Sequence, residues 1–363
     1  MTIDDEIANI VTKTHMYKEI FQQPYVVKQT LQNASKIFPD FLNLLEKKDY
    51  NLSIFGSGTS YHAGIAGSIA FSNIIGKYVP IDHASEWMYR FPKKINKPGV
   101  VIAISQSGES GDVIRSAQYA KSQDFNLVSI TNVLGSTLDE LGDLSFITPA
   151  GEEKAVAATK SYIAALASLL GWAVELEKEH HMQQKKLYQE LMTISSKMEK
   201  ILTTVEVDLK KITERLFNYN VVYFLGTGSN YSTALEGAMK LKETGNVYAE
   251  GFGFREFMHG HVQLISEETP IIIILSGEEN SSIIESGFER LENLGGSVFI
   301  FTQSGSQSLK TRLKSHKLFL NEYVDPLISP LTLVLPLQLL ACYNSKKRKL
   351  DPDQPSKLSK ITL

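Results

Sequence analysis

The stretch Ser105-Gln106-Ser107-Gly108-Glu109-Ser110 decides the fold, because it joins an apolar segment to a helical one. Residues 100–104 (Val-Val-Ile-Ala-Ile) follow Pro98-Gly99 and predict a buried strand. Apolar residues at helical spacing follow the loop, from Val113 to Ala120. A hydroxyl-rich loop before a helix offers an anion free N–H groups and a partial positive charge. We therefore predict a phosphate-binding loop, against the alternative of a serine-rich helix cap without a ligand.

Two common nucleotide-binding motifs are absent from the loops of the first half. The 105–110 loop has no lysine at the P-loop spacing, which argues against a nucleoside triphosphate. The run Gly56-Ser57-Gly58 lacks the third glycine of a dinucleotide fingerprint, because Tyr61 stands at that position. We therefore expect no nucleotide cofactor, and we expect no other cofactor.

Short apolar runs alternate with helical stretches on both sides of this loop. The strands predicted in the first half are 52–55, 78–81, 100–104, 126–131 and 145–147, with a helical turn at 85–89. The pattern then restarts, since residues 223–231 (YFLGTGSNY) echo residues 53–61 (SIFGSGTSY) at an offset of 170 positions. Residues 270–274 and 297–302 echo 99–103 and 126–131 in the same order, which indicates an internal duplication. The predicted fold class is α/β, with two tandem doubly wound parallel-sheet domains of three α/β/α layers.

The predicted organisation has five parts. They are an N-terminal helical segment (1–46), a first domain (47–175), a helical connector (176–216), a second domain (217–345) and a C-terminal tail (346–363). A second helix should begin at Pro24, and helices should cover residues 161–216, where Gly171 is the only glycine or proline in the sequence. The loop at 275–280 carries Glu278 and Glu279, which would repel phosphate. Only the first domain should therefore bind it.

Composition excludes several classes of protein. The chain has 363 residues, a formal net charge of −3 with dispersed charges, and an apolar fraction of 43%. These values favour a globular protein of about two domains and give no indication of binding to nucleic acid or membranes. The single cysteine, Cys342, allows no internal disulfide and should be buried and inert. With no signal peptide and no membrane-spanning run, we expect a soluble cytoplasmic protein.

Several motifs, in order along nearly the whole chain, resemble one enzyme family. The first-half motifs are Gly58-Thr59-Ser60-Tyr61, Ser85–Arg90 (SEWMYR), Ser105–Ser110 (SQSGES) and Ala158-Thr159-Lys160. The second-half motifs are Ala234–Glu243 (ALEGAMKLKE), His259-Gly260 and the tail 351–360. The chain resembles the isomerase half of glucosamine-6-phosphate synthase, or glutamine–fructose-6-phosphate aminotransferase, which consists of two sugar-isomerase (SIS) domains.

The resemblance implies a reaction and a set of partners. The family's synthases carry a glutaminase domain whose nucleophile is an N-terminal cysteine, whereas position 2 here is Thr2, so we expect this chain not to hydrolyse glutamine. The implied enzyme interconverts glucosamine 6-phosphate with fructose 6-phosphate and ammonia, without hydrolysing glutamine. A homodimer is expected, with His259 as the group contributed across the interface. A deglycase of fructosamine 6-phosphates and a non-catalytic sugar-phosphate sensor stay open as alternatives.

The resemblance also implies the roles of individual residues. Glu243 would be the base acting between C1 and C2, His259 would open the sugar ring, and Lys360 would form a Schiff base with the open-chain ketose. Lys240 completes the implied catalytic set. The implied substrate- and phosphate-binding residues are Thr59, Ser60, Ser105, Gln106, Ser107, Ser110, Val156, Ala158 and Ser359.

Taken without the resemblance, each of these catalytic residues has a plainer interpretation. Glu243 could be an ordinary charge on a helix face, and Lys360 one of several solvated lysines in a basic tail. His259 and His261 could be a metal pair, but an i, i+2 pair without a third ligand is a poor zinc site, so we expect no metal. Glu86 and Arg90 are predicted to form a structural i, i+4 ion pair.

Three further expectations concern local structure. Residues 251–253 (Gly-Phe-Gly) should form a turn that brings His259 toward Glu243. The apolar run 331–343 should be a buried helix that starts or kinks at Pro336, with a solvated basic run at 345–349. Pro352 and Pro355 should then make a stiff turn that places Lys360 over the site.

Four residues depart from the family pattern. Ala158 stands in place of a serine, Met258 of a basic residue, His261 of a proline and Thr227 of an arginine. These departures concern the identity of the substrate.

Overall fold

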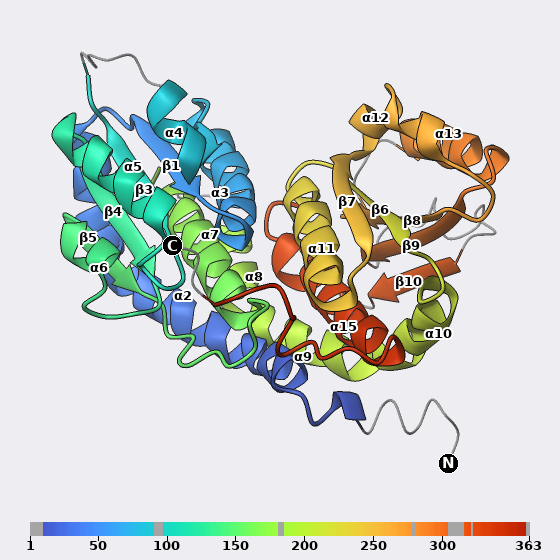
Figure 1. The fold of residues 1–363 in the computed structure, drawn as a ribbon. Coiled ribbons are helices and arrows are strands. Elements are labelled where there is room, and N and C mark those ends of the chain that lie inside the picture. The colour runs from blue at the N-terminus through green and yellow to red at the C-terminus, as the bar shows by residue number, and fades with distance from the viewer. Residues whose placement is uncertain are drawn as a thin grey trace. The chain divides into compact units, whose positions relative to one another are not determined.

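Two parallel sheets, each of five strands among the described residues, form the framework of the protein (Figure 1). The structure is a computed structural model and describes residues 10–90, 97–180, 185–277, 281–303, 316–320 and 322–360. By its contacts the chain divides into two compact units. We call residues 23–153, 158–195 and 359–363 the first unit, and residues 1–22, 154–157 and 196–358 the second unit. Each unit contains one sheet.

The first sheet has the strand order β2-β1-β3-β4-β5, with every pair parallel. Its strands are β1 (Leu52–Gly56), β2 (Ile81–His83), β3 (Val100–Ile104), β4 (Asn126–Thr131) and β5 (Leu144–Ile147). All residues of β1 and β3 are buried, as expected for central strands covered on both faces. The strand order reverses between β1 and β3, and ligands of open α/β sheets bind at such a point.

Helices cover both faces of this sheet (Figure 1). On one face, α3 (Thr59–Ile75) packs against α7 (Lys160–His180), and a Cβ added at Gly67 would lie only 2.8 Å from Leu169. On the other face, α4 (Ala84–Arg90), α5 (Gly111–Ser122) and α6 (Thr137–Leu141) enclose a core that includes Phe55, Trp87 and Val101. The small residues of α3 thus permit the close packing that positions the N-termini of α3 and α7 at the sheet.

The second sheet repeats the first in the corresponding order β7-β6-β8-β9-β10. Its strands are β6 (Val221–Gly226), β7 (Tyr248–Gly253), β8 (Pro270–Leu275), β9 (Ser297–Gln303) and β10 (His316–Leu320). In register, Ile54 lies opposite Ile102 in the first sheet, and Phe224 lies opposite Ile272 in the second. Both members of the pair are shifted by the predicted 170 positions. The fold class and the internal duplication are therefore confirmed.

The helices of the second unit include one long buried segment. α11 (Asn230–Gly245) packs against α15 (Pro330–Lys347), while α12 (Phe254–Phe257), the 3₁₀ turn η1 (His261–Leu264) and α13 (Ser281–Asn293) complete the described helices around the sheet. α15 is buried from Pro330 to Ser345, and it begins at Pro330 rather than at Pro336, which lies inside it. Burial raises the pKa of the Cys342 thiol to about 12, which accounts for the expected inertness.

One prediction about the N-terminal helix is wrong. Pro24 does not begin a second helix, because α2 (His15–Lys47) runs through both Pro24 and Pro39. Its apolar stripe continues across the proline, and Ile20, Val27 and Leu31 are all buried. A proline inside a helix costs about 3 kcal/mol, and this continuous burial offsets that cost.

The region 161–216, predicted to be helical, contains several helices. After α7 come α8 (Lys185–Met192), α9 (Ile194–Thr204) and α10 (Glu206–Leu216), with breaks at Thr193 and Val205. The Thr193 hydroxyl donates to the carbonyl oxygens of Gln189 and Glu190. Such side-chain bonds compete with helix continuation, and no glycine or proline marks this break in the sequence.

Two short segments also differ from prediction. The edge strand is Ile81–His83 rather than 78–81, because pairing with β1 starts from the Pro80 carbonyl, which accepts from the Ile54 N–H. Residues 251–253 form no turn, since Gly251 and Phe252 pair with β6 as part of β7. Two chain segments cross so closely there that a Cβ at Gly251 would lie 2.7 Å from the Leu235 backbone.

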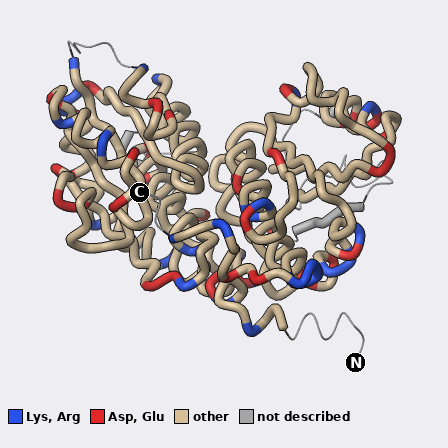
Figure 2. The backbone as a smooth tube through the Cα atoms, viewed as in Figure 1, with Lys and Arg blue, Asp and Glu red and all other residues tan. Residues whose placement is uncertain are grey.

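The basic run 345–349 is anchored rather than solvated. Ser345 is buried, and Lys347 pairs with Glu214 and lies over the Phe217 ring. Arg348 donates to Asn344 Oδ1 at 2.9 Å. Elsewhere, acidic and basic residues are interspersed along both units (Figure 2). Among the described residues, no helix has the length and apolarity that crossing a membrane requires.

Candidate functional site

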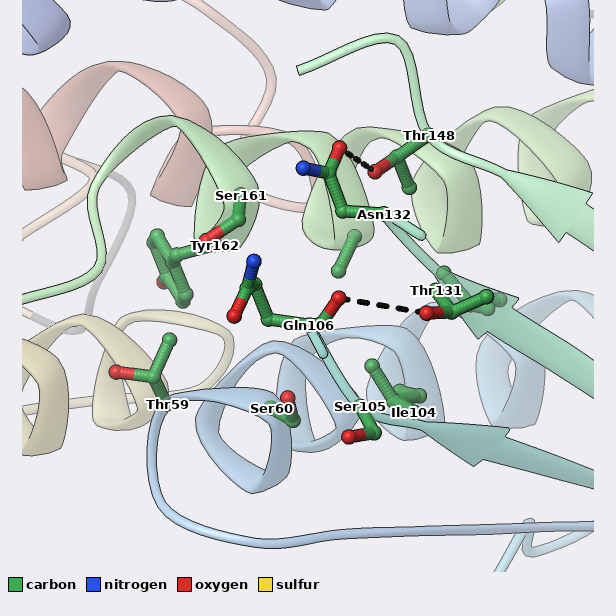
Figure 3. A pocket seen from close by; sticks show the side chains of 12 residues that line it. Thr59, Ser60, Ile104, Ser105, Gln106, Thr131, Asn132, Thr148, Ser161 and Tyr162 are labelled. Carbon is green, nitrogen blue, oxygen red and sulfur yellow. Dashed lines mark hydrogen bonds between the residues drawn. The ribbon is translucent and has the colours of Figure 1, made fainter. Parts of the chain in front are cut away.

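A small pocket lies at the carboxyl ends of the central strands of the first sheet (Figure 3). It forms where the loops after β1, β3 and β4 meet the first residues of α7. Its lining residues are Thr59, Ser60, Ile104, Ser105, Gln106, Ile130, Thr131, Asn132, Thr148, Ser161, Tyr162 and Ala165. The parallel topology places these strand ends at one edge of the sheet, as predicted for the 105–110 loop.

The pocket suits an anion although no charged side chain lines it. Thr59 and Ser60 are the first residues of α3, and Ser161 and Tyr162 follow the first residue of α7. The N-terminus of α3 carries a partial positive charge, whereas the first N–H groups of α7 donate to the Glu153 carboxylate. In Figure 3 the Gln106 side chain lies between these two helix starts. Hydroxyl and amide donors beside the N-terminus of α3 are a suitable environment for a phosphate group.

Hydrogen bonds fix the shape of the 105–110 loop. Ser105 Oγ accepts from the Gly108 N–H at 3.2 Å and lies 3.1 Å from Ser110 Oγ. Ser107 Oγ accepts from the Glu109 N–H at 3.1 Å. Of the predicted binding residues, Thr59, Ser60, Ser105 and Gln106 line the pocket. Ser107 and Ser110 belong to the loop but not to the lining.

Gly108 is required by this loop. Its φ is +69°, and a Cβ there would lie 2.1 Å from Ser136 Oγ. Its carbonyl oxygen accepts from the Leu138 N–H at 3.0 Å, which ties the loop to α6. Any side chain would be strained and would also displace α6, so the backbone approach that forms the loop depends on glycine.

Sequence reasoning identified four of the twelve lining residues and missed the other eight. Thr131 and Asn132 end β4, and Asn132 Oδ1 accepts from the Thr148 hydroxyl at 2.8 Å (Figure 3). Their position at the end of a predicted strand could have identified them. Ser161 and Tyr162 follow the Ala158-Thr159-Lys160 motif directly, yet only the packing of α7 on α3 brings them to the pocket.

A buried carboxylate in the first unit holds the predicted Schiff-base lysine. Glu153 is 7% exposed, and its Oε2 lies 2.9 Å from Lys360 Nζ. The same oxygen accepts from the Ser161 hydroxyl at 2.6 Å. Burial alone would raise the pKa of Glu153, but the Lys360 ammonium, the Ser161 hydroxyl and the Thr159 N–H together hold it below its usual value. Glu153 therefore carries a charge at neutral pH.

This depressed pKa predicts a loss of stability in acid. A carboxyl whose pKa is lower in the folded state stabilises the protein above its unfolded pKa, and this contribution is lost as the pH falls through the folded value. The free energy of unfolding of wild type should therefore exceed that of Glu153→Gln by a constant amount above about pH 5.5 and by less and less below about pH 4.5. Denaturant titrations across pH 3–7 measure it. Glu152→Gln, at the exposed neighbouring position, is the control and should follow wild type.

A second cluster of charges lies on α11 in the second unit. Lys240 is fully buried, and its Nζ lies 2.5 Å from Glu243 Oε2 and 3.3 Å from Glu236 Oε1. The Lys240–Glu243 contact is close as an ion pair but not aligned as a hydrogen bond. The Glu243 side chain keeps 22% of its surface exposed. A partly exposed carboxylate beside a buried ammonium can exchange a proton with a bound molecule. Sequence reasoning did not identify Glu236, because an acidic residue about one helical turn before Lys240 looks like part of an ordinary charged helix face.

Glu243 also lines a cavity with the C-terminal tail. This cavity of about 760 Å³ is partly open to solvent. Its lining residues are Met239, Lys242, Glu243, Asn246, Pro355, Ser356, Lys357 and Leu358. The tail segment after Asp353 therefore lies against the α11 residue that the resemblance makes the C1/C2 base.

The tail is anchored at Asp353. Its carboxylate oxygens accept from the His15 and Met16 N–H groups at 2.8 and 2.7 Å, which caps the start of α2. The Asp353 carbonyl oxygen accepts from the Val156 N–H at 2.9 Å. Glu19 accepts from the Lys154 N–H at 2.5 Å in the same unit. The tail and the segment that carries Val156 are therefore held by the same helix.

The other predicted site residues lie as follows. His259 is exposed after α12 and does not line the cavity at Glu243. His261 packs against Phe252 with the rings tilted and their centroids 4.1 Å apart. Ala158 is half-buried in the first unit without lining the pocket, and Ser359 is exposed. Within the described part of the chain, no three His, Cys, Asp or Glu side chains gather as metal ligands.

The predicted Glu86–Arg90 ion pair is wrong. Arg90 Nε instead lies 2.8 Å from Asp82 Oδ1, and the Glu86 carboxylate accepts from the Ser85 hydroxyl at 3.3 Å. Arg90 ends α4, and Asp82 belongs to the edge strand that precedes it. Arg90 therefore pairs with a residue of a neighbouring element instead of the residue four positions before it. Sequence spacing alone does not reveal such a partner. Glu278 and Glu279 lie outside the described residues.

Comparisons with known proteins agree on the nature of both domains. The model of the SIS domain matches residues 44–174 and 215–344. Among curated proteins, a glutamine–fructose-6-phosphate aminotransferase of Thermococcus kodakarensis is 34% identical over 352 residues, covering 95% of this chain and 57% of the relative. The corresponding protein of Aquifex aeolicus is 34% identical over 348 residues, covering 96% and 57%. The chain thus spans 57% of the length of these curated relatives.

Solved structures give the same result. The C-terminal domain of glucosamine-fructose-6-phosphate aminotransferase from Francisella tularensis superposes with a TM-score of 0.87 and 28% identity, covering 94% of this chain and 98% of that one. A glucosamine-6-phosphate deaminase from Thermotoga maritima has a TM-score of 0.74 at 21% identity, covering 96% and 100%. The second likeness concerns the fold.

Proposed function

Because the chain belongs to the SIS domain family, we propose that it is a phosphosugar isomerase and deaminase, which interconverts glucosamine 6-phosphate with fructose 6-phosphate and ammonia. The observation that carries the proposal is the contact between Lys360 and Glu153, beside a neutral pocket with two helix N-termini. An amine held at a phosphate site is what imine chemistry on a sugar phosphate requires. The relatives named above are similar enzymes of amino-sugar synthesis.

The proposed reaction assigns one task to each group. The sugar phosphate binds in the pocket through Ser60, Ser105 and Gln106. His259 opens the sugar ring, and the Lys360 amine attacks the C2 carbonyl and expels water to form an imine. Ammonia then displaces the lysine at C2, and Glu243 transfers a proton from C1 to C2, which yields the aldose with its amino group. In the opposite direction the same steps release ammonia.

Lys240 has a positioning task in this proposal. It is buried between Glu236 and Glu243 and fixes the Glu243 carboxylate on the surface of α11. Val156, Ala158 and Ser359 complete the proposed binding residues.

Ammonia rather than glutamine is the proposed nitrogen species. Glutamine hydrolysis in the related synthases uses a cysteine nucleophile, whereas the single cysteine of this chain is buried within α15. Its raised pKa leaves no thiolate near neutral pH. The pure chain should therefore form no glucosamine 6-phosphate from fructose 6-phosphate and glutamine.

One incubation tests the proposed reaction. The pure protein is mixed with glucosamine 6-phosphate, and released ammonia and fructose 6-phosphate are measured together. A parallel sample contains a fructosyl-amino-acid 6-phosphate, the substrate of the alternative deglycase. Equal amounts of ammonia and fructose 6-phosphate support the proposal. Release only in the parallel sample would assign the deglycase reaction, and binding without turnover of either compound would assign a sensor.

The pocket makes a separate prediction about binding. Ser105→Ala removes one hydroxyl from the lining, and a hydrogen bond to a charged group contributes about 1.5–3 kcal/mol. Affinity for sugar phosphates should therefore fall about tenfold or more, since 1.4 kcal/mol corresponds to a factor of ten. Calorimetry with sorbitol 6-phosphate, which has no carbonyl group, measures binding without reaction. The exposed Ser122→Ala is the matched control, and equal affinities of the two variants would remove the loop from the site.

We also propose a homodimer in which His259 acts on the partner's sugar. His259 is exposed and lies outside the cavity at Glu243, as a group that serves another subunit would. Sedimentation velocity over a range of concentrations gives the association state. A fully active monomer would contradict this assignment.

A further inference from the structure

Glu153 is a buried charge to which the proposed reaction assigns no task. It lies in the loop before α7 and accepts hydrogen bonds from two separate parts of the chain. Oε1 accepts from the N–H groups of Thr159, Lys160 and Ser161 at 2.8, 2.8 and 3.2 Å. Oε2 accepts from the Ser161 hydroxyl at 2.6 Å and from Lys360 Nζ at 2.9 Å. One carboxylate therefore joins the start of α7 to the tail lysine.

We propose that Glu153 is the positioning residue of the reaction, which holds the Lys360 amine beside the phosphate pocket and releases it to the sugar. The inference rests on the proposed function of Lys360. It adds a residue that the comparison of motifs did not single out and that touches neither phosphate nor the reacting carbons.

The link to the pocket runs through Ser161. Its hydroxyl donates to the same Glu153 oxygen that binds Lys360, and Ser161 itself lines the pocket (Figure 3). The lysine is thus held one side chain away from the pocket wall. A sugar whose phosphate occupies the pocket meets an amine whose position is already fixed, and fixed geometry is a main source of rate acceleration.

The arrangement also allows the lysine to leave. When Lys360 forms an imine with the sugar, Glu153 loses one donor and keeps five, namely three backbone N–H groups and the hydroxyls of Thr159 and Ser161. A buried carboxylate that keeps these bonds at a helix N-terminus stays compensated. Departure of the lysine therefore leaves no stranded charge, as it would if the ion pair were the only contact.

The same donors argue against Glu153 as the base that deprotonates Lys360. Each bond to the carboxylate stabilises its ionised form and makes it a weaker proton acceptor. Its task is therefore to hold the ammonium group, and the proton of Lys360 leaves to solvent or to another acceptor before the attack on C2.

The test follows imine formation directly. Fructose 6-phosphate and borohydride are added to wild type and to Glu153→Gln, and the reduced adduct on Lys360 is quantified over time by mass spectrometry. Glutamine keeps the shape of the side chain but removes the charge that holds the lysine. Adduct formation and kcat should fall about a hundredfold, the cost of misplacing a reacting group by about 1 Å. Affinity for sorbitol 6-phosphate should be unchanged, because the pocket is intact.

Two matched variants complete the experiment. Glu152→Gln removes a charge from the exposed neighbouring position and should behave as wild type. Glu153→Asp keeps the charge and shortens the side chain by one methylene, so it should restore part of the adduct formation. If the glutamine variant does not fold, the aspartate variant provides the test by itself. Adduct formation by Glu153→Gln or Glu153→Asp at the wild-type rate would overturn the inference, as would a parallel loss of adduct and phosphate affinity. No adduct in wild type would instead refute the proposed function.

Discussion

Replacing Lys360 by arginine should abolish turnover of glucosamine 6-phosphate while the protein stays folded. A guanidinium group keeps the positive charge that pairs with Glu153, so the buried carboxylate stays compensated. It cannot form an imine with a ketose, because it stays protonated and lacks a nucleophilic amine. Ammonia release should therefore fall to the background rate, and borohydride with fructose 6-phosphate should trap no adduct.

The controls for Lys360→Arg separate chemistry from folding. The exposed Lys349→Arg carries the same substitution in the same tail and should retain wild-type turnover. The affinity of Lys360→Arg for sorbitol 6-phosphate should also equal that of wild type. Residual turnover above background in Lys360→Arg would exclude an imine at this position. Deleting residues 351–363 is a less specific test, because it also removes the Asp353 cap from α2.

The second large effect is expected for Glu243→Gln. The amide has nearly the same shape as the carboxylate but cannot accept the proton that moves between C1 and C2. General base catalysis contributes about 10²–10⁴-fold, so kcat should fall by about that factor. The KM for glucosamine 6-phosphate should change little, because Glu243 is not among the residues that line the phosphate pocket.

Isotope exchange measures the Glu243 step by itself. Wild type in deuterated water should incorporate deuterium at the sugar C1 or C2, and Glu243→Gln should incorporate almost none. Glu250→Gln on β7 is the matched control, since Glu250 pairs with Lys242 on the surface. Borohydride should still trap Lys360 in Glu243→Gln, because imine formation precedes proton transfer. Full deuterium exchange in this variant would assign the base to another residue.

Local patterns predicted the framework because the determinants of these elements are local. β3 and β4 have the predicted bounds, since each is a short apolar run next to a glycine or an asparagine. The repeat at an offset of 170 positions was visible because the glycine loops after β1 and β6 have similar sequences. The predicted boundaries that were wrong lie where packing overrides a local signal. At Pro24, for example, the helix continues because the apolar stripe of α2 continues past the proline.

The candidate site could be predicted only in part. Ser105 and Gln106 lie in a loop whose composition indicates anion binding. Glu153 and Ser161 show no such signal, because an acid and a hydroxyl near a helix start are common, and their role depends on Lys360, 207 positions away from Glu153. The predicted ion pair of Arg90 was wrong for the same reason, since its partner Asp82 comes from another element. Residues that act through tertiary contacts cannot be found from spacing.

The Asp353 cap on α2 has a consequence for how the chain acquires its structure. The His15 N–H and the Asp353 carboxylate are separated by 338 positions, so α2 has an unsatisfied N-terminus until residue 353 has been synthesised. Contacts of such long separation form late and slow the overall folding rate. On the ribosome the amino-terminal helix should therefore remain frayed and open to proteases while both sheets are already assembled. Asp353 thus completes the N-terminus of a helix that lies 338 positions before it in the sequence.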